Sequence, residues 1–148
     1  MRSHKILGHT ADVRLFVEGS TLEELFTAAL EGMAEIIRGA AAENAANRGK
    51  GMSKAKNAAI QKEISVSSAN RTLLLIDFLS EILTLSQIEK VIFTSVKFHG
   101  LTAKTVKAEV YGKKVENFGE DIKAVTYHEA EIKKNKRGNL ETIIVFDI

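Results

Sequence analysis

The sequence predicts an α+β fold: a two-layer sandwich in which a mostly antiparallel sheet carries two helices on one face. Two segments place apolar residues at helical spacings of three and four, the first after Thr21 and the second after Asn70. Each follows a strand-like segment in which apolar and polar residues alternate, and the chain after the second helix consists of strand-like runs. Helices followed by a run of strands are typical of α+β folds, whereas a parallel α/β sheet needs alternating elements.

Length, composition and charge narrow the class of protein. With 148 residues, 45% of them hydrophobic and 27% charged, we expect a single folded domain over residues 1–148. The net charge of +2 does not indicate a nucleic-acid-binding protein, and the absence of cysteine excludes disulfides, thiolate metal sites and cysteine catalysis. The N-terminus lacks the apolar core of a signal peptide, and no apolar run approaches the ~20 residues of a membrane span. We therefore expect a cytoplasmic protein that is a monomer or weak oligomer and does not enter a membrane.

The first strand is expected to begin at Asp12, and the first helix follows it. Val13, Leu15 and Val17 alternate with residues that face the other way. Thr21 and Glu24 have the spacing of a capping box. Gly39 is a suitable end for the helix. The apolar stripe of this helix consists of Leu22, Leu25, Phe26, Ala29, Leu30, Met33, Ile36 and Ile37.

Residues 40–62 are expected to form a mobile, basic connection. Few large apolar residues are present there to offset the entropy of ordering the chain. Its basic residues either keep a loop solvated or contact phosphate groups, and they are Arg48, Lys50, Lys54, Lys56 and Lys62.

The second half of the chain is expected to begin with a short strand at Ile64 and Val66 and a helix capped by Asn70. Asp77, on the polar edge of this helix, is either an additional acid near a site or an ordinary exposed carboxylate. The buried face of the helix consists of Leu74, Leu75, Phe78, Leu79, Ile82 and Leu83. Further strands are expected over residues 91–98, 102–110, 124–132 and 140–148.

The segment Lys133–Asn139 carries four positive charges at the turn of an expected hairpin. Lysines at such a turn often discourage association of sheet edges. Contact with RNA or with an acidic partner is the alternative interpretation.

The most promising chemistry lies where the first and last strands are expected to meet. If these strands pair antiparallel, Asp12, Asp147 and the terminal carboxylate of Ile148 come together at one end of the sheet. Three carboxylates in one place need a compensating cation or basic group. Oxygen-only ligands suit a hard divalent cation, which we expect to be Ca²⁺, with Mg²⁺ or Mn²⁺ also possible. The alternative is that Asp12 only caps a turn.

Three more residues near these motifs are candidates. His9 is either a ligand or proton carrier or a residue that fixes the turn into the strand. His128 is expected to be an ordinary core or edge histidine. Lys123 either directs an ammonium group at a phosphate or a partner's carboxylate, or is simply exposed at the start of a strand.

Four short motifs give the sequence a resemblance to the archease family. They are His9-Thr10-Ala11-Asp12-Val13, the segment from Gly19 to Phe26, the segment from Asp121 to His128, and the closing Phe146-Asp147-Ile148. The resemblance covers most of the chain except about Ala40 to Gln61, which looks longer and more basic than expected for the family. It implies a metal ion held by Asp12, Asp147 and Ile148 and a functionally important lysine at Lys123.

The resemblance also implies an accessory role beside an enzyme. Archeases act on RNA ligases of the RtcB type, which join tRNA-splicing ends using GTP and Mn²⁺. This protein would bind such a ligase transiently, promote formation of its guanylylated intermediate and allow multiple turnover, so its association with tRNA would be indirect. The sequence lacks a Gly-rich phosphate loop, a Ser–His–Asp order and an HExxH motif, and we therefore do not expect an enzyme. The alternative is a small RNA-binding or chaperone-like module that uses the basic loops.

Overall fold

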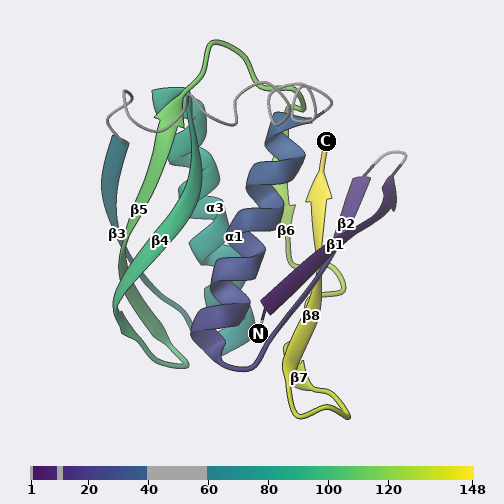
Figure 1. Ribbon diagram of the computed structural model, residues 1–148. Helices are drawn as coiled ribbons and strands as arrows, with labels where there is room; N and C mark the ends of the chain where they lie inside the picture. The colour runs from purple at the N-terminus through teal and green to yellow at the C-terminus, as the bar shows by residue number, and fades with distance from the viewer. Residues whose placement is uncertain (1, 10–11, 40–59) are drawn as a thin grey trace.

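The computed structural model of this chain describes residues 2–9, 12–39 and 60–148, without the side chains of residues 8 and 9 (Figure 1). The expected connection over residues 40–62 therefore lies largely outside the described residues. The elements in chain order are β1 (Arg2–His9), β2 (Asp12–Gly19), α1 (Leu22–Arg38), β3 (Ile60–Ser67), α3 (Arg71–Glu89), β4 (Val91–Leu101), β5 (Thr105–Lys114), β6 (Ala124–Thr126), β7 (Lys133–Lys134) and β8 (Leu140–Asp147).

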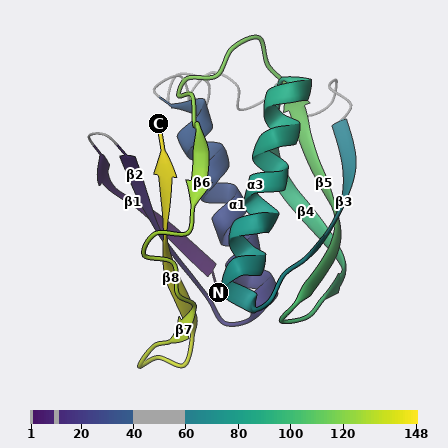
Figure 2. The same cartoon turned by 180° about the vertical axis from the view of Figure 1, so that it is seen from behind.

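The strands form two antiparallel sheets, and both helices stand between them (Figures 1 and 2). One sheet has the order β1-β2-β8-β6 with β7 beside β8, and the other has the order β3-β5-β4. α1 contacts β1 and β2 of the first sheet and β4 of the second, and α3 likewise contacts strands of both. The α+β class, the antiparallel pairing and the two helices are confirmed. The layers differ from the expected sandwich, because the strands divide into two sheets that cover the helices from both sides.

The composition of α3 explains why one sheet does not suffice. Leu74, Leu75 and Ile76 are consecutive and fully buried, and together they extend around most of the helix circumference. An apolar face this wide needs cover from more than one side, even though the polar edge of α3 with Asp77 and Glu81 stays accessible. The second sheet provides the missing cover.

The helix ends follow the expected caps. The Glu24 backbone N–H donates to the Thr21 hydroxyl at 3.1 Å, and the Glu24 carboxylate accepts from the Ser20 backbone N–H at 2.8 Å. Gly39 ends α1 with a φ of +62°, which favours glycine. Asn70 caps α3 by accepting from the Leu73 N–H at 3.0 Å.

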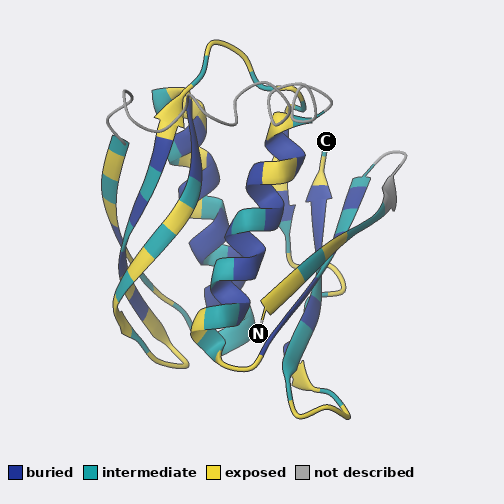
Figure 3. Ribbon diagram, in the orientation of Figure 1, coloured by how far each residue is buried: buried dark blue, intermediate teal, exposed yellow. Residues whose placement is uncertain are grey.

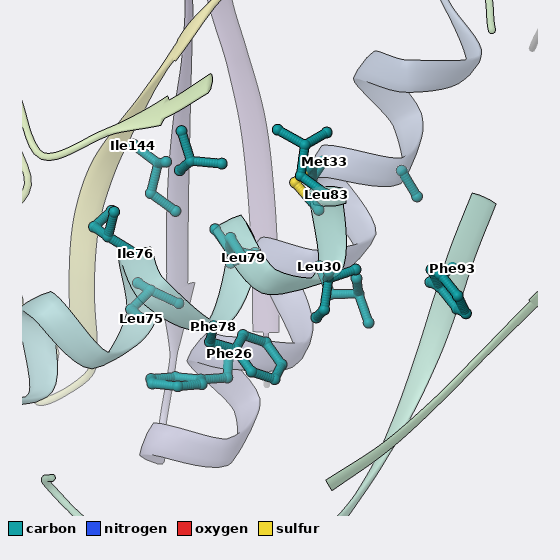
Figure 4. Packing of buried hydrophobic residues seen from close by; sticks show 14 of the residues in the cluster. Phe26, Leu30, Met33, Leu75, Ile76, Phe78, Leu79, Leu83, Phe93 and Ile144 are labelled. Carbon is teal, nitrogen blue, oxygen red and sulfur yellow. The ribbon is translucent and has the colours of Figure 1, made fainter. Parts of the chain in front are cut away.

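The core lies between the two sheets and is centred on the helices (Figure 3). Phe26 of α1 and Phe78 of α3 have ring centroids 5.1 Å apart, and Phe98 of β4 stacks on Phe78 at 6.2 Å. Figure 4 shows Phe26 and Phe78 side by side between the helices.

Neither helix in the described ranges combines the length and apolar character that a membrane-spanning helix requires.

Several strand boundaries differ from the sequence prediction. β1 was not predicted, since its first residues are mostly polar and do not alternate with apolar ones. β5 continues to Lys114, past the expected end at residue 110, and β3 begins at Ile60, inside the expected connection. The expected strand over 124–132 is reduced to β6, because residues 127–132 leave the ladder before β7 pairs with β8.

β1 is an edge strand whose Arg2 and His4 side chains pair with carboxylates of α1 at the surface. Arg2 forms two hydrogen bonds of 2.9 Å to Glu31 of α1, and His4 lies 2.5 Å from Glu35. Charged side chains on an edge strand discourage it from pairing with another molecule. This role accounts for a strand without an apolar pattern.

Candidate functional site at the end of the β2–β8 pair

The backbone register brings the two expected aspartates face to face. β2 and β8 pair antiparallel, and Asp12 is the direct partner of Asp147. On the other side of β8, Asp147 is paired with Ala124 of β6. The predicted meeting of the two strands is therefore confirmed, and it lies between two further strands rather than at an edge.

Direct partners on neighbouring strands project to the same face of the sheet, with Cβ atoms about 4.5–5.5 Å apart. Asp12 is half-buried and Asp147 is exposed. The next pair in the register, Val13 and Phe146, is buried, with exposed fractions of 3% and 0%. The two carboxylates thus extend from a packed base, which limits how far they can move apart.

Ile148 and Lys123 lie beside this pair. The Ile148 side chain packs against the hydrophobic core, which anchors the end of β8. The Lys123 backbone N–H donates to the Asp147 carbonyl oxygen at 2.7 Å. Asp12, Asp147 and Ile148 are called the acidic tip below, and Lys123 is its exposed neighbour.

His9 comes near the acidic tip through its backbone. It is the partner of Val13 across β1 and β2, next to Asp12 in sequence. Its side chain lies outside the described part of the chain, so the choice between a ligand and a turn-fixing histidine stays open.

The nearest positive charge along β2 is already paired. Arg14 lies two residues from Asp12 on the same face, and its Nη2 donates to Glu129 at 2.9 Å. Its Nε is buried and has no hydrogen-bond partner among the residues that the structure describes. No short-range pattern signals this contact, because Arg14 and Glu129 are 115 residues apart. The Arg14 charge is thus engaged by Glu129, which does not belong to the acidic tip.

The donor set of the acidic tip fits a hard cation only if main-chain oxygen and water contribute. Within residues 2–9, 12–39 and 60–148, no three side chains of His, Cys, Asp or Glu gather to hold a metal ion. Asp12 and Asp147 provide two carboxylates, and the Ile148 carboxylate would be the third. Mg²⁺ commonly binds through one or two carboxylates and water, and Ca²⁺ takes six to eight oxygen ligands.

Asp77 and His128 do not join the acidic tip. The Asp77 carboxylate accepts hydrogen bonds from the Ser68 hydroxyl at 2.6 Å and the Tyr127 hydroxyl at 2.5 Å. The bond to Asp77 raises the pKa of Tyr127. His128 is exposed, and its backbone N–H donates to the Thr126 hydroxyl at 3.3 Å. Asp77 therefore has a structural role, tying α3 to the segment before it and to the end of β6.

The basic hairpin turn lies at the opposite end of β8 from the acidic tip (Figure 1). Arg137 forms a 2.7 Å ion pair with Glu18 of β2, and the side-chain amides of Asn135 and Asn139 also donate to Glu18. These hydrogen bonds, from Asn139, Arg137 and Asn135, lower the pKa of Glu18 to about 2. One of the four cations at this turn is therefore neutralised within the protein, and Lys133, Lys134 and Lys136 remain exposed.

Comparison with known proteins identifies relatives along the whole chain. The family described as the archease protein family (MTH1598/TM1083) matches residues 4–148. The archease of Pyrococcus furiosus is 30% identical over 155 residues, covering 100% of both chains.

Two solved structures have a similar fold. Protein 1598 of Methanobacterium thermoautotrophicum matches with a TM-score of 0.70 at 22% identity, covering 98% of each chain. A Thermotoga maritima protein, described as an archease and possible chaperone, matches with a TM-score of 0.59 at 22% identity, covering 97% of this chain and 96% of that one.

Proposed function

This chain belongs to the archease family, and from this membership we infer that it is a protein cofactor of an RtcB-type RNA ligase in tRNA splicing. It binds the ligase transiently, promotes guanylylation of the ligase and so permits multiple turnover. The observation that supports this role most directly is the register that pairs Asp12 with Asp147 beside Lys123. These residues converge from three separate segments, and they include the positions that the family resemblance implies.

The acidic tip is proposed as the part that enters the ligase active site. Asp12, Asp147 and the Ile148 carboxylate would hold a hard divalent cation, which suits oxygen-only donors; we propose Ca²⁺, with Mg²⁺ or Mn²⁺ as alternatives. Such a cation would supply positive charge that stabilises the negative charge of a phosphate group. The buried Val13–Phe146 pair beneath the carboxylates keeps them oriented before the ligase arrives.

Lys123 is proposed to contact the ligase or its nucleotide. Its backbone is fixed to Asp147, while its side chain is exposed. A lysine ammonium is a compact charge on a flexible stem, which suits contact with a phosphate oxygen or with a carboxylate of a partner. The acidic tip and the Lys123 ammonium group would therefore contact different atoms within one site of the ligase.

The decisive experiment measures guanylylation of a matched RtcB-type ligase with substoichiometric amounts of this protein. The native chain is compared with a variant carrying one extra glycine after Ile148, which moves the terminal carboxylate without altering the core. Asp12→Ala and Asp147→Ala test the side chains, and Glu63→Ala, an exposed carboxylate on the other sheet, is the matched control. Circular dichroism confirms that each variant is folded.

Activation by the native chain and by Glu63→Ala, lost in the three other variants, is the expected result. Activation unaffected by the added glycine would remove the terminal carboxylate from the mechanism but leave the cofactor role. Full activation by Asp12→Ala and Asp147→Ala would refute the proposed role of the acidic tip in ligase activation. No activation by the native chain would refute the cofactor role itself.

A further inference from the structure

A basic cavity lies between the end of α1, the start of β4 and the end of β5. Its volume is about 290 Å³, and it is lined by Arg38, Ile92, Thr94, Lys113, Lys114 and Val115. The three basic side chains are all exposed, and the described lining contains no carboxylate. The ends of α1 and β5 lie at the same end of the molecule as the C-terminus (Figure 1). None of these residues belongs to the acidic tip or to the basic hairpin turn.

A β-bulge shapes the floor of this cavity. Phe93 is paired with Gly112 and Ser95 with Tyr111, so Thr94 is an extra residue in β4 without a partner in β5. A β-bulge bends the strand and redirects a side chain, and bulges are frequent beside functional sites. Gly112 is required here, since a Cβ atom on it would lie 2.2 Å from the Ile92 carbonyl oxygen. The backbone therefore holds Thr94 against the cavity in a fixed arrangement.

The wall formed by α1 is held by a close backbone contact. A Cβ atom on Gly119 would lie 1.9 Å from the Arg38 carbonyl oxygen, so only glycine allows this approach. The N–H groups of Gly119 and Glu120 both donate to the Ile37 carbonyl oxygen, at 2.9 and 3.1 Å. Free carbonyl groups at a helix C-terminus repel anions. These donors engage one of them, and the Gly39 N–H engages the Glu35 carbonyl oxygen.

We propose that this cavity binds a phosphate group of an RNA backbone or of a nucleotide. Arg38 offers the planar, forked donors that match phosphate oxygens, and Lys114 adds positive charge. Thr94 contributes a hydroxyl group. A hollow lined by charges of one sign focuses the electrostatic field and attracts the opposite ion.

The lining also indicates which part of the ligand is recognised. The described residues of the lining include no aromatic ring on which a base could stack, and the volume of the cavity is at the small end of ligand pockets. The site therefore recognises a phosphate group and not a base. We expect binding that does not depend on nucleotide sequence. This assignment rests on neither the acidic tip nor the ligase.

The test measures binding of a fluorescent single-stranded RNA 12-mer by anisotropy at several salt concentrations, and competition by GTP. The variant Arg38→Gln with Lys114→Gln is compared with a matched control, Lys133→Gln with Lys134→Gln, which removes the same charge from exposed β7. Removing two cationic side chains from the cavity should weaken binding by roughly tenfold or more. The salt slope should fall by about 0.7 for each phosphate that the variant no longer neutralises. The control should bind like the native chain.

An amide NMR titration with inorganic phosphate locates the site independently of affinity. The expected shifts lie at Thr94, Lys114 and Val115, and they disappear in the Arg38→Gln, Lys114→Gln variant while the rest of its spectrum stays native. That spectrum also shows whether the variant is folded.

RNA binding that the cavity variant weakens and GTP does not displace would identify an RNA backbone phosphate. Displacement by GTP would identify a nucleotide phosphate, and both outcomes support the site. Equal binding by native and cavity variant, equal weakening in the β7 control, or no binding of RNA, GTP or phosphate would overturn it. None of these results depends on ligase activation, so a failed guanylylation assay leaves this test intact.

Discussion

Replacing Asp12 by asparagine should change stability in opposite directions with and without calcium. Asp12 and Asp147 are direct partners, so their Cβ atoms lie about 5 Å apart, and we take the same separation for their charges. In a water-like dielectric, two unit charges at that distance repel by about 0.8 kcal/mol. Asp12→Asn keeps the shape of the side chain and removes this repulsion. Without metal, the variant should be more stable than the native chain by up to about 0.8 kcal/mol, or about 2–3 °C in Tm for a domain of this size.

Calcium should reverse this order. A ligand present at 100 times its Kd stabilises the folded state by about 2.7 kcal/mol, and the native chain would gain this while the variant, with one carboxylate fewer, would gain much less. Thermal unfolding followed by circular dichroism, in EDTA and then in excess CaCl₂ at the same low ionic strength, measures both effects.

Glu63→Gln is a close control for this experiment. Glu63 of β3 is the direct partner of Glu109 of β5, so it also faces a carboxylate across a strand pair. Because no metal is proposed to bind there, replacing Glu63 should change the Tm by the same amount in EDTA and in CaCl₂. The reasoning would be refuted if Asp12→Asn were less stable than the native chain in EDTA, or if calcium raised the Tm of both proteins equally.

Three further predictions concern the core, the hairpin turn and Lys123. Phe26→Ala removes a fully buried ring that packs on Phe78, so it should cost about 3–5 kcal/mol in urea unfolding, and a cost below about 1 kcal/mol would contradict this packing. The lowered pKa of Glu18 means that its carboxylate stabilises the fold above about pH 4.5, and this contribution is lost as the pH falls towards 2. Between pH 5 and pH 2.5, the free energy of unfolding in urea should therefore fall less for Glu18→Gln than for the native chain. Equal losses would contradict the stabilising role of the hydrogen bonds to Glu18. Lys123→Ala should leave the Tm unchanged, since the side chain is exposed, but reduce ligase guanylylation; unchanged guanylylation would remove Lys123 from the proposed contact.

The pairing of β2 with β8 was predictable because both segments carry clear strand patterns. Alternation assigns each side chain to a face, and antiparallel pairing then places Asp12 opposite Asp147. The caps at Thr21, Gly39 and Asn70 were also predictable, since each depends on a few neighbouring residues.

The number of sheets and the edge strand were not predicted, for different reasons. Periodicity shows which face of an element is apolar but not how many layers cover it. The consecutive buried residues Leu74, Leu75 and Ile76 were the available signal for a second sheet. β1 had no apolar pattern, because Arg2 and His4 pair with carboxylates of α1.

The site was predictable only in part. The register alone brings the two aspartates together, whereas the proposed role of Lys123 rests on its place before a strand and on the family resemblance. The Arg14–Glu129 pair and the cavity beside Arg38 join residues that are far apart in sequence. Such contacts depend on the completed tertiary structure and leave no local pattern.

The central place of β8 has a consequence for the synthesis of this protein. β8 lies between β2 and β6, and it is the last described element to leave the ribosome. Until it emerges, β2 has no partner on one side and β6 has none in its sheet. A nascent chain can assemble the β3-β5-β4 sheet earlier, but the other sheet must wait for β8 to be translated. A chain released early would therefore lack the strand that joins β2 to β6, so incomplete translation products would be poorly folded.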